Sequence, residues 1–131
     1  MFHMSPMSWN YLFFVTLLVP VCMIGAGLFL WFNPPKTINS IYGYRTKRSR
    51  YSQEAWDYAQ RFSGRLCFFL GLVTLGITVA AMLNSRELAE VEMTGNALSV
   101  VLAQLTPFAG VYLATERAIV RKITSERSKQ K

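Results

Sequence analysis

Long uncharged apolar stretches alternate along this chain with short segments that hold nearly all of its charge. The uncharged stretches cover residues 9–32, 66–83 and 97–114, and they contain no Asp, Glu, Lys or Arg. An α-helix rises about 1.5 Å per residue, so about 20 apolar residues cross a hydrocarbon core about 30 Å thick. The pattern therefore predicts an all-α membrane protein with three transmembrane helices, organised as a single membrane domain over residues 1–131.

The basic residues lie beside alternate ends of these stretches, which predicts how the chain is oriented in the membrane. Segment 33–65 holds seven Lys and Arg residues and the tail 115–131 holds six, whereas the loop between the second and third stretches holds only Arg86. Cytoplasmic loops carry an excess of Lys and Arg. We therefore expect both basic segments in the cytoplasm and the amino terminus outside. Losing one span would place a basic cluster outside, so the charges also favour three spans.

The composition argues against a soluble enzyme. Charged residues make up 16% of the chain against a usual ~25%, while apolar residues make up 52%. The net charge of +7 comes from the two basic segments, so we expect it to meet anionic lipid headgroups of the inner leaflet and not nucleic acid. His3 is the only histidine and there are two cysteines, so the sequence predicts no metal site. No cofactor or catalytic residue is predicted.

Small residues recur at helical spacing in the second and third spans. Such stripes let helices pack closely in lipid. We expect the two stripes to face each other within one chain, and a homodimer interface is the alternative. Gln104, at mid-depth in the third span, needs a hydrogen-bond partner, for which we expect Thr74 or Thr78. The stripes consist of Gly71, Thr74, Thr78 and Ala81 in the second span and of Ser99, Ala103, Thr106, Gly110 and Ala114 in the third.

Residues 52–65 have the pattern of an amphipathic helix ahead of the second span. Ser52 is a good N-cap residue, and Glu54 lies favourably in the first turn. Apolar residues such as Trp56 and Phe62 gather on one side of the expected helix and charged residues on the other. We expect this cytoplasmic helix to lie on the inner leaflet before the chain turns into the second span, where it is also a candidate docking surface.

The segment before this helix carries the most specific motif in the chain. It reads I-N-x-x-Y-G-Y-R-T-x-x-S over residues 38–49. Tyrosine rings favour the membrane interface, glycine permits a tight turn, and arginine pairs with carboxylate or phosphate. With a proline upstream and a tryptophan downstream, the candidate binding residues are Pro35, Asn39, Tyr42, Gly43, Tyr44, Arg45, Thr46, Ser49 and Trp56.

This motif, placed between an apolar span and a short amphipathic helix, resembles the SdpI family of bacterial membrane proteins. That family includes immunity proteins that protect a producing cell from its own secreted killing peptide, and small three-span members. The resemblance implies a multi-pass protein of the bacterial cell membrane that confers toxin resistance by binding and not as an enzyme. A secreted toxin peptide is then the expected partner. The alternative is a membrane scaffold or regulator whose basic cytoplasmic face recruits a soluble partner such as a repressor.

One ion pair is expected between the motif and the third span. Glu116 is the first charged residue after that span, and the topology places it at the same membrane face as Arg45. We expect Arg45 to pair with Glu116 and so to pin the loop to the third helix. The alternative is that Arg45 meets lipid phosphate while Glu116 pairs locally with Arg117 or Arg121.

Overall fold

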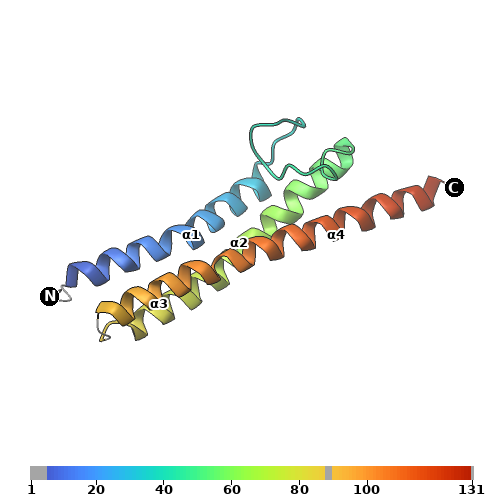
Figure 1. Cartoon of the computed structure of the whole chain (residues 1–131). Coiled ribbons are helices and arrows are strands. Elements are labelled where there is room, and N and C mark those ends of the chain that lie inside the picture. The colour runs from blue at the N-terminus through green and yellow to red at the C-terminus, as the bar shows by residue number, and fades with distance from the viewer. Residues whose placement is uncertain (1–5, 88–89, 131) are drawn as a thin grey trace.

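The computed structural model describes residues 6–87 and 90–130, which form helices and one long loop (Figure 1). α2 is the central helix: α1 runs antiparallel along it, and α3 and α4 follow each other antiparallel to it on another side (Figure 1). His3 and residues 88–89 of the second loop lie outside the described residues. The helices are α1 (Pro6–Phe32), α2 (Gln53–Asn84), α3 (Glu90–Ala103) and α4 (Leu105–Gln130).

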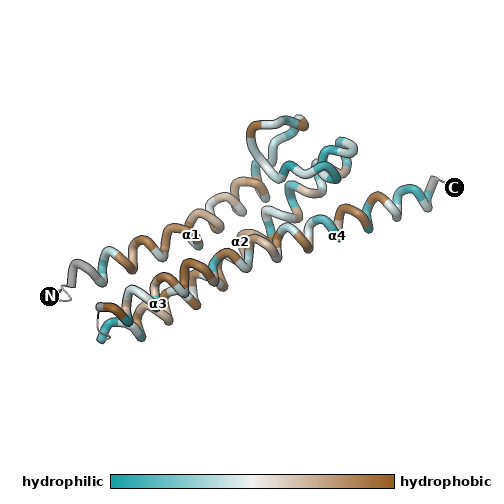
Figure 2. The backbone as a smooth tube through the Cα atoms, viewed as in Figure 1, coloured by the Kyte–Doolittle hydropathy of each residue, from teal (hydrophilic) through white to brown (hydrophobic). Residues whose placement is uncertain are grey.

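Three helical segments are long and apolar enough to cross a membrane: Trp9–Phe32, Gln53–Asn84 and Val91–Lys129. The predicted all-α membrane fold with three spans is confirmed, and the protein is a multi-pass membrane protein. Figure 2 shows the apolar residues along the helices and polar residues at the long loop and at the carboxyl-terminal end of α4. Large apolar side chains point outward, such as Phe14 (64% exposed) and Ile77 (65% exposed), as expected for helices surrounded by lipid.

α2 is one continuous helix, which corrects the expected turn between a surface helix and the second span. Its N-cap is Ser52, as predicted, and the Ser52 hydroxyl accepts a hydrogen bond from the amide of Ala55 at 3.0 Å. The amphipathic part continues without a break into the second span, and part of its apolar face packs on α4. Ala55 and Ala59 pack against Ile119 of α4, which continues beyond the end of the predicted third span.

The third span is interrupted at Gln104, where α3 ends and α4 begins. Pro107 has no amide hydrogen, so the carbonyl of Ala103 lacks its usual helical donor at this point. The Gln104 side-chain nitrogen donates to the Thr78 hydroxyl at 3.0 Å and to the Thr16 carbonyl at 2.8 Å. The predicted contact with Thr78 is confirmed. The structure adds a partner on α1 that the sequence did not indicate.

The glycines show the closest backbone approach between α1 and α2. A Cβ atom added to Gly27 would lie 2.5 Å from the backbone nitrogen of Phe68, and one added to Gly64 would lie 2.8 Å from the nitrogen of Trp31. Gly71 also faces α1, where an added Cβ would meet side-chain and backbone atoms within 3.1 Å. The prediction that the two stripes of small residues face each other is therefore wrong for Gly71.

Other members of the two stripes face each other across a groove instead of packing together. Thr74 and Thr78 of α2 line the same groove as Thr106 and Gly110 of α4. A Cβ atom added to Gly110 would meet a single atom of Leu70, at 4.0 Å, among the described residues. The stripe on α3 and α4 therefore remains open in the single chain.

Thiol labelling tests the orientation that the basic residues predict. In a background of Cys22→Ala and Cys67→Ala, we expect Thr94→Cys, exposed on α3, to react with an impermeant reagent added to intact cells. We expect Lys47→Cys, exposed in the long loop, to react only after the membrane is opened. External labelling of Lys47→Cys at the rate of Thr94→Cys would contradict the topology with the amino terminus outside.

Two glycines of α1 give a matched test of the α1–α2 contact. Gly27→Ala should destabilise the protein by about 1–3 kcal/mol in detergent melts, because the new methyl group overlaps the backbone of α2. Gly25→Ala is the control, since an added Cβ there meets no described atom within 4 Å. It should be neutral or stabilise by up to about 1 kcal/mol through its helix propensity. Equal effects of the two changes would show that α1 and α2 do not approach closely.

Candidate functional site: the motif loop and its grooves

The loop between α1 and α2 carries the sequence motif, and local hydrogen bonds fold its first turn. The Asn39 side-chain oxygen accepts from the amides of Ile41 and Tyr42, both at 2.9 Å, which closes an Asx turn. Gly43 follows with a φ of 101°, a left-handed conformation that favours glycine. An added Cβ there would also lie 2.7 Å from the side-chain oxygen of Gln60. Glycine is thus required by its own backbone and by the closeness of α2.

Gln60 of α2 clamps the backbone of the loop at Tyr44. The Gln60 side-chain oxygen accepts from the Tyr44 amide, and its nitrogen donates to the Tyr44 carbonyl, each at 2.7 Å. Gln60 is fully buried, so either atom would be costly to leave unpaired. Sequence reasoning missed this residue. Its signal is a polar side chain on the apolar face of an amphipathic helix, four residues after Trp56.

Thr46 and Ser49 close the next turn of the loop by reciprocal hydrogen bonds. The amide of Thr46 donates to the Ser49 hydroxyl at 2.8 Å, and the amide of Ser49 donates to the Thr46 hydroxyl at 3.2 Å. The Ser49 hydroxyl itself lies within donating distance of the carbonyls of Tyr44 (3.1 Å) and Thr46 (2.9 Å). Ser49 is fully buried, so its place in the motif is explained by the fold of the loop.

Trp56 fixes the start of the loop to α2. Its indole nitrogen donates to the Pro35 carbonyl at 2.7 Å, and both residues are buried. The Pro35 ring also lies against Gly43, where an added Cβ would be 2.8 Å away. The beginning and the middle of the loop are therefore packed together on the same helix.

The Tyr44 side chain reaches across to α4 and to the buried carboxylate of Glu116, which is 6% exposed. The Tyr44 hydroxyl donates to Oε1 at 2.7 Å, and Arg48 donates to Oε2 at 3.2 Å. Burial alone would raise the pKa of Glu116, but hydrogen bonds from Thr46, Tyr44 and Arg48 outweigh it and hold that pKa below its usual value. Burial and then the neighbouring carboxylate raise the pKa of Tyr44, so its hydroxyl remains a donor.

The cation beside Glu116 is Arg48, so the predicted pair between Arg45 and Glu116 is wrong. Arg45 is exposed and donates to the carbonyl of Ser40 within the loop. The two arginines stand three residues apart, and the turn between them decides which one faces α4. The expected attachment of the loop to the third span through Glu116 does hold, with a different arginine and with a tyrosine.

Tyr42 and Arg45 are the motif side chains that the fold leaves at the surface. Tyr42 is 46% exposed and lies against Phe29 of α1, with ring centroids 6.1 Å apart. The neighbouring Ile41 is 81% exposed. A groove of about 480 Å³ lies between the end of α1 and the loop, and we call it the loop groove. Its lining includes Phe29, Ile41, Tyr42 and Lys36. It combines apolar walls with a nearby positive charge.

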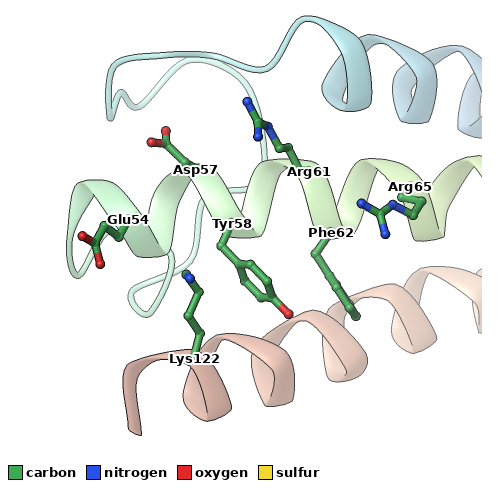
Figure 3. Close-up of a pocket in the computed structure, with 7 residues that line it drawn as sticks. All are labelled: Glu54, Asp57, Tyr58, Arg61, Phe62, Arg65 and Lys122. Carbon is green, nitrogen blue, oxygen red and sulfur yellow. The ribbon is translucent and has the colours of Figure 1, made fainter. Parts of the chain in front are cut away.

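A second groove, of about 500 Å³, lies between the first turns of α2 and the later part of α4 (Figure 3). Tyr58 and Phe62 point from α2 toward α4 and stack with ring centroids 5.8 Å apart (Figure 3). Lys122 of α4 lies 5.2 Å from the centre of the Tyr58 ring. Charged side chains of both signs complete this charged groove; they are Glu54, Asp57, Arg61 and Arg65.

Sequence comparison relates most of the chain to a known family. A family model described as the SdpI/YfhL protein family matches residues 36–115. The curated relative "Uncharacterized protein YfhL" of Bacillus subtilis (strain 168) is 49% identical over 55 residues, which cover 42% of this chain and 50% of the relative. The chain thus spans about half the length of this relative. No solved structure matches the chain.

The assignment of Arg48 to Glu116 predicts the outcome of a double-mutant cycle. Glu116→Ala should destabilise the protein by about 1–3 kcal/mol, because the Tyr44 hydroxyl loses its buried acceptor. Combining it with Arg48→Ala should cost about 0.5–1 kcal/mol less than the sum of the two changes. This coupling is modest because the Arg48 side chain is 57% exposed. Arg45→Ala is the matched control and should be additive with Glu116→Ala.

Acid should remove the same coupling. The pKa of Glu116 is lower in the folded protein than its ordinary value of 4.5. The ionised carboxylate therefore stabilises the fold above that ordinary value, and the contribution is lost as the pH falls through the lowered folded pKa. Repeating the cycle at a series of falling pH values checks this, because the coupling should shrink as the carboxylate is protonated. Coupling of Glu116 to Arg45, or coupling to Arg48 that stays constant as the carboxylate is protonated, would contradict the assignment.

Proposed function

The chain belongs to the SdpI/YfhL protein family, and from this membership we propose that it protects a bacterial cell against a secreted antimicrobial peptide by binding that peptide. The motif around Tyr44 resembles that of the family's immunity proteins, which guard a producing cell from its own killing peptide. In this proposal the protein lies in the cell membrane with the motif loop at the cytoplasmic face, as the distribution of Lys and Arg predicts. It acts without catalysis.

The observation that carries this proposal is the loop groove. Its walls include Phe29, Ile41 and Tyr42, and the loop that forms one side is fixed to α2 through Gln60. Binding sites are usually concave, largely apolar and formed before the ligand arrives. A loop that is already ordered loses little conformational freedom on binding, which favours affinity. The groove therefore has the properties of a recognition surface.

A peptide that inserts into the membrane fits the loop groove better than a soluble substrate does. The groove lies where α1 ends, at the predicted inner boundary of the membrane, which an apolar peptide reaches once it has crossed the bilayer. Ile41 and Tyr42 offer it apolar contact. Lys36 offers positive charge for a carboxylate of the peptide. Binding there would sequester the peptide in its inserted state.

A second candidate function is the recruitment of a soluble regulator, such as a repressor, to the membrane. The observation that favours it is the charged groove, in which Lys122 lies beside the aromatic side chains of Tyr58 and Phe62 (Figure 3). Charges around an interface steer and orient a protein partner. The two functions differ in what they require: protection by binding needs only this protein and the peptide, whereas recruitment also needs the soluble partner.

Expression in a sensitive bacterium that lacks related genes, followed by challenge with a panel of secreted bacterial peptides, tests the first function. We expect the protein to raise the inhibitory concentration of at least one peptide by about tenfold. Tyr42→Ala should remove most of this increase, because it deletes an aromatic wall of the loop groove. Tyr42 is half-exposed, and the side-chain hydrogen bonds that fix the loop to α2 and α4 come from other residues, so the variant should still fold.

A matched tyrosine makes the result specific. Tyr51→Ala removes a side chain that is 58% exposed and lies outside both grooves, so it should leave protection unchanged. Membrane fractions must hold equal amounts of the three proteins. Full protection by Tyr42→Ala would contradict the role of the loop groove. Failure of the wild-type protein to protect against every peptide, while present in the membrane, would contradict the proposed function.

A further inference from the structure

A third groove, of about 430 Å³, opens within the predicted membrane span between α2 and the junction of α3 and α4. It lies far along the chain from the motif, and nothing in the loop contributes to it. Its lining is almost entirely apolar or small. The residues that matter for its shape are Val73, Ile77, Val100, Ala103, Thr106 and Gly110.

One buried polar atom in the lining of this groove lacks a partner. Gln104 is 2% exposed, and its side-chain oxygen accepts no hydrogen bond from any described residue. Its nitrogen already donates to the Thr16 carbonyl and the Thr78 hydroxyl. A flip of the Gln104 amide would place its oxygen beside the Thr16 carbonyl oxygen. Since both oxygens only accept hydrogen bonds, the orientation of the amide is fixed. At this depth no water is available, and an unpaired acceptor favours any donor that enters the groove.

The occupant that the groove fits is a helix. Thr106, Gly110 and Ala114 stand at four-residue spacing on α4, the arrangement that lets two helices approach closely in lipid. In the single chain this stripe is left open, since a Cβ atom added to Gly110 would meet one atom of Leu70 at 4.0 Å. Lipid tails would fill the groove but have no hydrogen-bond donor for Gln104.

We propose that this groove is the interface between two copies of the chain, with α4 of each copy packed into the groove of the other. Two copies inserted with the same topology are related by a twofold axis along the membrane normal, which places equal depths opposite each other. A donor for Gln104 must therefore come from nearly the same depth. Thr106 lies two residues away, about 3 Å along the helix, and is exposed in the groove.

In the dimer the Thr106 hydroxyl of each copy donates to the Gln104 oxygen of the other, so the pair occurs twice. The Gln104 nitrogen keeps its bonds to the Thr16 carbonyl and the Thr78 hydroxyl, and the oxygen gains the partner that it lacks in the single chain. Gly110 sits at the close approach of the two α4 helices. This interface is independent of the proposed function, because it involves neither the loop groove nor the charged groove.

Cysteine cross-linking in native membranes tests the dimer. In the background of Cys22→Ala and Cys67→Ala, oxidation should convert Ala114→Cys, which lies on the same stripe and leaves the Thr106 donor in place, into a disulfide-linked dimer with at least about five times the yield of Gly76→Cys. Gly76 is the control, because it lies on α2 two residues from Thr78, outside the groove, and an added Cβ there meets no described atom within 4 Å. Equal yields at the two positions would overturn the proposal.

Variants at a second glycine show whether close packing holds the dimer. Adding Gly110→Leu to Ala114→Cys should reduce the dimer yield at least about fivefold, whereas adding Gly76→Leu should leave it unchanged. Gly110→Ala, the milder change, should give an intermediate yield if Gly110→Leu lowers the amount of protein. A yield that none of these changes alters would overturn the proposal. So would a cross-linked product whose mass shows a different protein, since the groove would then hold another partner's helix.

Discussion

The hydrogen bond from the Tyr44 hydroxyl to the buried Glu116 carboxylate is the contact on which one whole end of the molecule depends. The same residue is held at its backbone by Gln60, so a single tyrosine joins the loop to α2 and to α4. Each of these groups is shielded from water, and losing one partner leaves the other unpaired. Arg48 adds a charge-assisted bond to the same carboxylate, and the bonds from Thr46, Tyr44 and Arg48 together hold its pKa below the usual value. The loop is therefore part of the helical core and not a linker between spans.

The motif contains two kinds of residue: those whose contacts fold the loop, and those whose side chains lie exposed on its surface. Turns and buried hydrogen bonds of the loop require Gly43, Tyr44 and Ser49. Replacing any of them would mainly lower the stability of the fold. Tyr42 and Arg45 lie at the surface, where Tyr42 packs against Phe29 of α1 and Arg45 donates to the carbonyl of Ser40 in the loop. A motif found in a sequence does not distinguish these two kinds of residue. The geometry does so, and it leaves the exposed pair accessible for the recognition that we propose.

The parts that could be predicted from the sequence are those for which lipid allows a single solution. Long uncharged stretches had to be spans, and a polar side chain at the depth of Gln104 had to find a partner such as Thr78. The choice between Arg45 and Arg48 depended on the direction of one turn, which spacing does not fix. Periodicity likewise identified small residues on each helix without telling which neighbour they face. For this reason the contact through Gly27 was not expected.

The measurement that tests this account most directly is residue-resolved amide hydrogen exchange of the protein in lipid nanodiscs. The central claim is that the motif loop is docked on α2 through buried hydrogen bonds. It predicts that the Tyr44 amide, which donates to the buried oxygen of Gln60, exchanges at least about a hundredfold more slowly than the amide of the exposed Lys47 in the same loop. Equal and rapid exchange at the two positions would show a loop that moves freely, and would contradict the claim.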